Sequence, residues 1–370
     1  MGRMRADYIM VGGFLGAGKT TALLRLAQHL TAQGRRVGLI TNDQSSGLVD
    51  SALVGAHGFP VEEITGGCFC CRFNSLIQAA ERLARRAKPD VLLAEPVGSC
   101  TDLRATVQNP LRRMYGDEYR VGPLSVLLDP LRALRVLGLA PGKTFSDKVL
   151  YVYGKQLEEA DILVVNKCDL LGAEQANCLE EALRQRYPQA ELFRVSARQG
   201  TGLDPWFAAL AGDQASRAAP PVDYDAYAEG EALLGWLNTT LRLSAGEPFD
   251  GNRLLMQVAG QISRRLSAES IEIAHLKMTL TPNGETGELG ALHLVGGSQE
   301  AELPYRLKRE LSGGELILNL RAEGPPEVLR KTVEDAVAAG AAASGALAQV
   351  QHLEHFRPAQ PVPTHRLEVV

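Results

Sequence analysis

The fold is decided by residues 12–21, which read Gly12-Gly13-Phe14-Leu15-Gly16-Ala17-Gly18-Lys19-Thr20-Thr21. They fit the pattern G-x-x-x-x-G-K-[ST], whose glycines let backbone N–H groups point inward at a phosphate. Residues 7–11 read as a strand, and residues 21–27 read as a helix whose N-terminus adds positive potential. We therefore predict a phosphate-binding loop built from Gly13, Gly16, Ala17, Gly18, Lys19, Thr20 and Thr21.

Composition sets bounds on the rest. The chain has 370 residues, 45% of them hydrophobic, which is enough for two domains with sizeable cores. Its net charge of −4 gives no support for nucleic-acid binding, and we find no apolar run long enough to span a bilayer. Six cysteines, three of them within residues 68–71, do not suggest a disulfide framework. We expect a cytoplasmic protein with no nucleic-acid or membrane partner.

Residues 1–212 alternate strand-like and helix-like segments. Short apolar strands are expected at 37–41, 90–94, 124–128, 162–165 and 192–195, with amphipathic helices between them. This alternation predicts an α/β fold, the doubly wound, mostly parallel sheet of a P-loop NTPase. Ligands of such sheets sit at the carboxyl ends of the strands.

A smaller domain is expected after this one. Pro220 and Pro221 mark residues 213–228 as a linker. Residues 229–370 predict an α+β domain, for which we expect a ferredoxin-like arrangement and a role in binding a client or partner. Its expected helices are 253–266 and 326–340, and its expected strands are 275–280, 291–295, 315–320 and 348–353.

A second motif selects the base. Asn166-Lys167-Cys168-Asp169 follows a predicted strand and has the form N-K-x-D. The Asp169 carboxylate can accept hydrogen bonds from N1–H and the 2-amino group of guanine, whereas adenine offers no such donor pair. Lys167 would lie over the base, Asn166 would brace the loops, and a backbone N–H at Ser196 or Ala197 would meet the guanine oxygen. We therefore predict GTP and GDP as ligands.

Two carboxylates follow neighbouring strands. Asp43 and Glu95 should reach the γ-phosphate region, where either could bind Mg²⁺ with Thr20 or hold the attacking water. Lys19 would contact the β- and γ-phosphates, and Gly98 would allow the backbone near the γ-phosphate to move. Lys19, Asp43 and Glu95 are therefore the predicted catalytic residues. Two solvated carboxylates at strand ends are the alternative.

Three thiols lie within four residues, Cys68-Phe69-Cys70-Cys71, after two glycines. Such a cluster suits a thiophilic divalent metal such as Zn²⁺ or Co²⁺. Buried small hydrophobic residues or a redox centre are the alternatives. Cys100 is a weaker candidate for a fourth ligand.

Taken together, these motifs resemble those of the CobW-like GTPases, which are related to the HypB and UreG metallochaperone GTPases. The resemblance rests on residues 12–21, 42–43, 66–71, 95–98 and 156–169, in the order of that family. It implies GTP hydrolysis, an E-x-x-G switch and a metal site of Cys68, Cys70 and Cys71. Pro96 and Val97 depart from the threonines common within that switch, and a histidine-rich tract is missing from the sequence.

The leading hypothesis is a GTP-hydrolysing metallochaperone that delivers a divalent metal to a client metalloprotein or cofactor-synthesis enzyme. The alternative is a GTPase switch that regulates a corrinoid or other metalloenzyme and uses its thiols only for structure. Slow intrinsic turnover is expected, with Arg72 as the one candidate for an arginine finger. A homodimer is possible.

Overall fold

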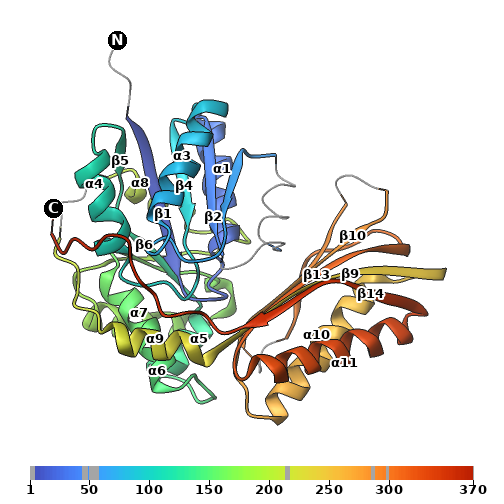
Figure 1. Cartoon of the computed structure of the whole chain (residues 1–370). Helices are drawn as coiled ribbons and strands as arrows, with labels where there is room; N and C mark the ends of the chain where they lie inside the picture. The colour runs from blue at the N-terminus through green and yellow to red at the C-terminus, as the bar shows by residue number, and fades with distance from the viewer. Residues whose placement is uncertain are drawn as a thin grey trace. The chain divides into compact units, whose positions relative to one another are not determined.

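The computed structural model describes residues 5–43, 49, 58–212, 217–284, 288–296 and 300–369. They divide into two compact units (Figure 1). Residues 5–43, 58–212, 217–230 and 360–369 fall in the first unit, and residues 49, 231–284, 288–296 and 300–359 fall in the second. The last residues of the chain thus belong with the nucleotide-binding motifs, and not with the predicted domain 229–370. Hydrogen bonds from Thr364 and Leu367 to that first unit explain the difference.

The predicted linker is also shorter in the structure. Its residues 213–216 lie outside the described part of the chain, and residues 217–223 contain no helix or strand. Helix α9 (Tyr224–Leu233) begins inside the segment predicted as linker. Tyr227 of this helix is buried, and its hydroxyl accepts a hydrogen bond from the Thr101 N–H. The helix is therefore packed on the first unit at its start.

The first unit contains a parallel sheet, as predicted. The spatial order is β3-β2-β4-β1-β6-β7-β8, with β5 beside β1, and each described pair is parallel. The strands are β1 (Ala6–Gly13), β2 (Val37–Asn42), β3 (Val61–Ile64), β4 (Val91–Glu95), β5 (Tyr119–Val121), β6 (Ser125–Leu128), β7 (Ile162–Val165) and β8 (Glu191–Arg194).

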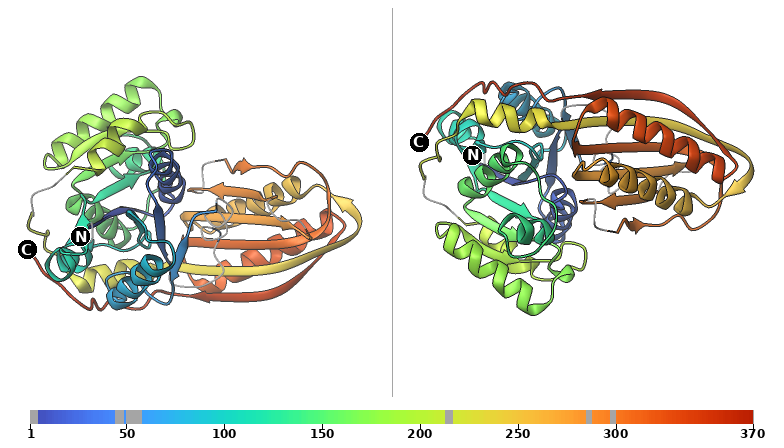
Figure 2. Two further views of the ribbon diagram at one scale, coloured as in Figure 1. Left: turned by 90° about the horizontal axis from the view of Figure 1, so that it is seen from above. Right: turned by 90° about the horizontal axis from the view of Figure 1, so that it is seen from below.

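Helices flank this sheet on both sides (Figure 2). The chain leaves β1 toward β2 and β3, returns to β4, and continues past β1 to β6, so right-handed crossovers place helices on opposite faces. They are α1 (Lys19–Ala32), α3 (Phe73–Arg86), α4 (Asn109–Tyr115), α5 (Pro130–Val136), α6 (Asp147–Glu159), α7 (Ala173–Arg186) and α8 (Leu203–Leu210). Arg104–Gln108 forms a π-helical turn before α4, and Cys168–Leu170 forms a 3₁₀ turn. The phosphate loop and both predicted carboxylates lie where strands end.

The second unit is an antiparallel sheet with two helices on one face. The sheet order is β12-β11-β10-β13-β9-β14, and α10 and α11 lie side by side over it (Figure 2). Its elements are β9 (Leu234–Phe249), α10 (Gly251–Ala268), β10 (Ile273–Pro282), β11 (Gly290–Leu294), β12 (Glu302–Tyr305), β13 (Leu311–Glu323), α11 (Pro326–Ala343) and β14 (Ala346–Phe356). Without β11 and β12, the order β10-β13-β9-β14 and the βαββαβ chain path are those of a ferredoxin-like domain.

Close packing joins the two helices of this unit. A Cβ on Gly340 of α11 would lie 2.7 Å from Cγ2 of Val258 in α10, so the helices approach too closely for a larger residue there. The apolar sides of both helices and the facing strand residues, among them Leu276, Leu318 and Leu237, form one buried core. No helix in the described ranges has the length and apolar character needed to cross a membrane.

Strand β9 is the longest element that the sequence did not indicate. Its central Asn238 is buried in the sheet and accepts a hydrogen bond from the Asn319 side chain at 2.9 Å. Nearby, the buried Arg321 guanidinium lies 4.0 Å from the centroid of the Trp236 ring. Asn238 interrupts the apolar alternation that would reveal a strand, and its side chain is hydrogen-bonded across the sheet to Asn319 on β13 and Glu354 on β14.

Candidate nucleotide and metal site

The phosphate loop follows β1 and needs glycine at two positions for different reasons. Gly13 has φ +132°, and a Cβ there would lie 2.3 Å from the Leu127 carbonyl oxygen on β6. Gly18 has φ +87°, and a Cβ there would lie 2.5 Å from the Asn166 side-chain nitrogen. The loop thus fits a cradle that side chains would fill. The Lys19 ammonium donates to the Gly13 carbonyl at 2.9 Å, across the mouth of this loop.

Strand β4 brings a carboxylate to the same place. The Thr20 hydroxyl donates to Oε1 of Glu95 at 3.0 Å, so two of the predicted Mg²⁺ ligands are already neighbours. Asp43 follows directly after β2, whose Thr41 is paired with Glu95 in the sheet register. The Asp43 backbone N–H donates to the Ile64 carbonyl. Hydroxyl and carboxylate oxygens of this kind suit Mg²⁺.

The loop after β4 presses against the phosphate loop at Gly98. A Cβ on Gly98 would lie 2.7 Å from Leu15 Cδ2, 3.0 Å from the Leu15 nitrogen and 3.1 Å from its Cα. Two of these three atoms belong to backbone, which cannot swing aside as a side chain does. The loop that carries Glu95 and Gly98 therefore has little freedom to move independently of the phosphate loop.

The predicted guanine motif is braced as expected. The Asn166 side chain donates to the Ala17 carbonyl at 2.9 Å and accepts from the Ala197 N–H at 3.0 Å. Lys167, with φ 55°, donates to the Gly16 carbonyl at 2.9 Å. These contacts connect the loops after β7 and β8 to the phosphate loop, so the segments predicted to bind the base and the phosphates share one framework.

Asp169 has one carboxylate oxygen in use and one available. Arg198 donates to Oδ2 at 2.8 Å, whereas Oδ1 is buried and has no hydrogen-bond partner within the part of the chain that the structure describes. Burial works to raise the pKa of Asp169, but hydrogen bonds from Ser196 and Arg198 outweigh it and hold that pKa below its usual value. A buried, ionised acceptor of this kind fits the paired donors of guanine.

The backbone of the loop after β8 is already engaged. The Ser196 N–H donates to the Thr201 carbonyl, and the Ala197 N–H donates to Asn166. For either of them to meet a guanine oxygen, as predicted, it must share or exchange that acceptor.

The sequence analysis did not identify two charged residues that connect these loops, Asp129 and Arg25. Asp129, at the end of β6, is buried and bonded to the Lys167 ammonium at 2.9 Å. Burial acts to raise the pKa of Asp129, but Lys167 and Arg132 overcome it and lower that pKa. Arg25 on α1 donates to the Ala197 and Arg198 carbonyls at 3.0 and 2.8 Å. The sequence does contain one signal for Asp129. This carboxylate directly precedes Pro130 after a predicted strand, a pattern typical of the start of a helix.

The three thiols of the Cys-x-Cys-Cys segment come together in the structure. They lie in a tight turn before α3, in which the Cys71 N–H donates to the Cys68 carbonyl at 3.1 Å. The Cys68 and Cys71 sulfurs are 3.2 Å apart, the Cys70 and Cys71 sulfurs are 3.7 Å apart, and all three lie within 4.8 Å of one another. One ion bound at about 2.3 Å can touch sulfurs spaced in this way.

The environment of Cys70 and Cys71 favours their protonated thiol forms. The pKa of Cys70 is raised well above its usual value by its contacts with Cys100, Cys68 and Cys71 and by burial. The contact with Cys68 is the largest cause that raises the pKa of Cys71 to about 11. An activated redox thiol has the opposite property, a lowered pKa. The raised pKa values therefore argue against an activated redox thiol at Cys70 and Cys71, and a cation that binds these sulfurs has to displace their protons.

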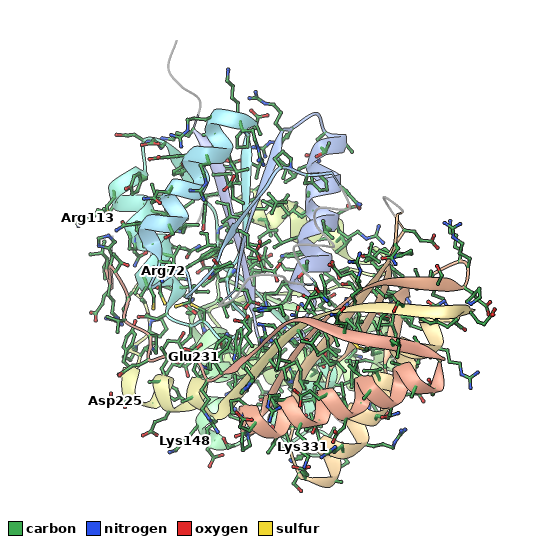
Figure 3. The ribbon with its side chains drawn as sticks, turned by 45° about the vertical axis from the view of Figure 1, so that its right-hand side comes forward. Arg72, Arg113, Lys148, Asp225, Glu231 and Lys331 are labelled. Atoms are coloured by element: carbon green, nitrogen blue, oxygen red, sulfur yellow. The ribbon has the colours of Figure 1, made fainter. Side chains whose placement is uncertain are left out.

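Asn42 connects the cysteine turn to the end of β2. Its side-chain nitrogen donates to the Ile64 carbonyl at 3.0 Å and to the Gly67 carbonyl at 2.7 Å. Arg72, labelled in Figure 3, donates to the Gly66 carbonyl at 3.0 Å and packs along Gly67. The residue before Asp43 and the residues before Cys68 are thus held together.

The segment at the end of α6 holds the loop after β4. The Gln156 side chain donates to the Gly98 and Cys100 carbonyls at 2.9 and 2.8 Å. The Glu159 carboxylate accepts from the Thr101 hydroxyl and from the Arg104 N–H. Burial raises the pKa of Glu159 to about 8, so it is mostly neutral at pH 7. Arg104 also forms a buried ion pair with Asp161.

The C-terminal tail covers the cysteine turn. The Thr364 N–H donates to the Cys70 carbonyl at 2.9 Å, and the Val362 N–H donates to the Cys71 sulfur at 3.2 Å. Arg366 anchors the tail through Asp102 at 2.8 Å. Cys71 remains half-buried, whereas Cys68 and Cys70 are buried. The tail therefore lies on the side from which solvent reaches the thiols.

We expect Gly98→Ala to weaken binding of a GTP analogue by about 5- to 100-fold, because overpacking at a site of this kind costs about 1–3 kcal/mol. The added Cβ displaces the backbone of Leu15 in the phosphate loop. Titration with a fluorescent analogue measures the effect. Gly172→Ala, where a Cβ would meet nothing within 4 Å, is the matched control. Equal affinity in both variants would contradict the tight contact.

We expect removal of residues 360–370 to speed the alkylation of Cys70 and Cys71 by a maleimide several-fold, because the tail backbone lies over both. Mass spectrometry of the labelled cysteines measures each rate in the metal-free protein. Exposed Cys178 on α7 serves as the internal control and should not change. Unchanged rates at Cys70 and Cys71 would show that the tail does not shield them.

Comparisons with known proteins agree with this geometry. Residues 7–194 match the family model described as CobW/HypB/UreG, nucleotide-binding domain. The chain is 32% identical over 179 residues to the zinc chaperone YeiR of Escherichia coli (strain K12), covering 48% of this chain and 51% of that protein. It is 27% identical over 198 residues to the zinc chaperone CobW of Sinorhizobium sp, covering 48% of this chain and 55% of that protein.

Among solved structures, the Zn(II)-bound YjiA GTPase from E. coli is 16% identical, with a TM-score of 0.38, and the match covers 90% of this chain and 99% of that chain. The chain spans about half the length of the curated relatives named above. The family model covers half of the chain, including the phosphate loop, both carboxylates, the cysteine turn and the guanine motif. By this match the protein belongs to the CobW/HypB/UreG family, through its nucleotide-binding domain.

Proposed function

We propose that the protein is a GTP-hydrolysing metallochaperone that binds a divalent metal through Cys68, Cys70 and Cys71 and delivers it to a client metalloprotein or cofactor-synthesis enzyme. One observation supports this proposal most strongly. Three thiol sulfurs lie within 4.8 Å of one another, on a turn that a hydrogen bond from Asn42 connects to the end of β2 beside Asp43. The curated names of its relatives YeiR and CobW, both zinc chaperones, support Zn²⁺ as the cargo, with Co²⁺ as a further candidate.

The nucleotide roles follow from the contacts. The backbone of Gly13–Gly18 would cradle the phosphates, Lys19 would leave the Gly13 carbonyl to contact them, and Thr21 lies in the same first turn of α1. Asp169 would accept the guanine donors at its buried Oδ1, in competition with Arg198 for the carboxylate. The Lys167 stem would cover the base.

Thr20, Glu95 and Asp43 would hold Mg²⁺, which supplies positive charge to the transferring phosphoryl group. Either carboxylate, when not bound to the ion, is placed to orient the attacking water. We expect slow turnover by the protein alone. Arg72, the arginine considered for the transition state, first has to give up its hydrogen bond to Gly66.

Coupling between nucleotide and metal would run through Asn42. This residue precedes Asp43, and its side chain holds the carbonyls of Ile64 and Gly67 at the entrance to the cysteine turn. A shift of Asp43 toward a bound nucleotide would pull on the same segment that sets the sulfur positions. Because the thiols must be reduced to bind metal, we place this activity in the cytoplasm.

If this is correct, Zn²⁺ and the GTP analogue change each other's affinity by one common factor, as linkage requires, and factors of about 5–150 are typical. Calorimetry measures Zn²⁺ binding with GTP analogue and with GDP, and analogue binding with and without Zn²⁺, at saturating Mg²⁺. In Cys70→Ala the factor should fall to one. Equal analogue affinity with and without Zn²⁺ in the unmodified protein would rule out a gated chaperone.

Asp169→Asn is expected to reduce GTP affinity by about 10- to 100-fold and to raise affinity for xanthosine triphosphate. The asparagine oxygen can still accept a hydrogen bond from N1–H. The asparagine NH₂ group, however, is a donor that would face the 2-amino donor of guanine. Xanthine has an oxygen in place of that 2-amino group and can accept from the NH₂ group. Competition binding with both nucleotides measures the exchange. Asp204→Asn, at an exposed carboxylate on α8, is the control. Unaltered preference for GTP would show that Asp169 does not read the base.

A further inference from the structure

We propose that Cys100 supplies a fourth thiolate to the metal held by Cys68, Cys70 and Cys71, and that this ligand comes from the loop that follows the nucleotide-sensing carboxylate Glu95. The inference rests on the proposed metal-binding function and adds to it a ligand from a second segment of the chain. Its consequence is that the metal connects the cysteine turn to the loop after β4.

The distance between the sulfurs is the first argument. The Cys100 sulfur lies 3.8 Å from the Cys70 sulfur, and both side chains are almost fully buried. Four sulfurs at about 2.3 Å from a tetrahedral Zn²⁺ are separated by about 3.8 Å from one another. The pair Cys70–Cys100 therefore already has the spacing of one edge of a four-thiolate site. The Cys70 and Cys71 sulfurs are 3.7 Å apart, which is the spacing expected for a second edge of the same tetrahedron.

The other sulfur–sulfur distances show which side chains have to move for four sulfurs to bind one ion. Cys68, Cys70 and Cys71 are all within 4.8 Å of one another, but Cys100 does not meet that limit with all three. Closing the fourth corner therefore requires the Cys100 side chain or its loop to move inward. The Cys68 and Cys71 sulfurs, 3.2 Å apart, would also have to separate toward the spacing of about 3.8 Å. Three ligands come from one turn, and the fourth depends on the position of its loop.

That loop is the one most closely coupled to the nucleotide site. It begins at Glu95, which contacts Thr20, and touches Leu15 of the phosphate loop at Gly98, two residues before Cys100. Gln156 holds the carbonyls of Gly98 and Cys100 together, so the two residues are fixed to one side chain. A change at the γ-phosphate position would therefore be transmitted to the Cys100 sulfur through a short, constrained segment.

The number of ligands decides what the site does. Zinc sites with four protein ligands are closed and retain the metal, whereas sites with three keep a position open for another ligand. With Cys100 bound, the protein would hold its cargo. With Cys100 withdrawn, the open position would accept a donor atom from the client. The Val362 N–H, 3.2 Å from the Cys71 sulfur, would stabilise the negative charge of the thiolates in either state.

The test compares the full-length protein with Cys100→Ala, using Co²⁺ as a spectroscopic probe and X-ray absorption of bound Zn²⁺ to count sulfur ligands. Alanine is chosen because it adds no polar group to a buried position. We expect four sulfur ligands in the unmodified protein. In Cys100→Ala we expect three, with a fall of about one quarter in the thiolate-to-cobalt charge-transfer intensity. Affinity should fall by at least the roughly 10- to 100-fold that loss of a supporting contact costs.

Two control variants separate the possible outcomes. Cys178→Ala, at an exposed thiol on α7, should leave the spectrum unchanged, and Cys70→Ala should abolish tight binding. Three sulfurs in both the unmodified protein and Cys100→Ala would overturn the inference and leave the metallochaperone proposal standing. Metal binding that is the same in Cys70→Ala as in the unmodified protein would overturn both. A circular dichroism spectrum that matches that of the metal-free unmodified protein establishes that Cys100→Ala is folded, and sulfur counting on the unmodified protein decides the question if it is not.

Discussion

The close approach of Gly98 to the backbone of Leu15 is the constraint on which the rest of the site depends. Because a Cβ at position 98 would lie about as close to backbone atoms as non-bonded atoms ever come, the loop after β4 and the phosphate loop cannot shift past each other without strain. The hydrogen bond from Thr20 to Glu95 fixes the start of the same loop. Gln156 fixes its continuation through two carbonyls. The phosphate loop and the loop that carries Cys100 are thereby closely connected, so a movement of one is expected to displace the other.

The buried polar groups around this loop explain why the segment before β7 has its sequence. Gln156, Glu159 and Asp161 contact the Gly98 carbonyl, the Thr101 hydroxyl and the Arg104 guanidinium, which are all buried. Unpaired polar groups in such a place are costly, so loss of any one partner would destabilise the loop conformation itself. The sequence that encodes the loop after β4 is therefore accompanied by groups on α6 and directly before β7 that hold this loop in place.

Sequence reasoning anticipated the local structure best where a motif is contained in a short segment. The phosphate loop, the guanine motif and the three clustered thiols each bring their own geometry, and the parallel order of the first sheet follows from alternating apolar runs. It failed where a contact joins distant segments. Thr364 and Cys70 are almost three hundred residues apart, and nothing in the Pro-rich tail indicates that its backbone pairs with the cysteine turn. Asp129 and Arg25 act only through groups on other loops, so their roles became visible with the fold. Strand β9 was missed because its central polar residues are satisfied across the sheet and not along the chain.

The burial of the sulfurs also indicates from which side metal is exchanged. Cys68, Cys70 and Cys100 are almost fully enclosed, whereas Cys71 is half-buried and is contacted by the tail at Val362. If the protein passes its metal to a client as proposed, the incoming donor atom needs access to the ion. Of the three clustered thiols, Cys71 is half-buried and the other two are buried. A client would therefore approach beside Cys71, where the Val362 N–H and the Thr364 hydroxyl contact that residue. Cys100 contacts the cluster through the buried Cys70, so a movement of its loop would reach the metal from within the protein, and an approaching client would reach it past the tail.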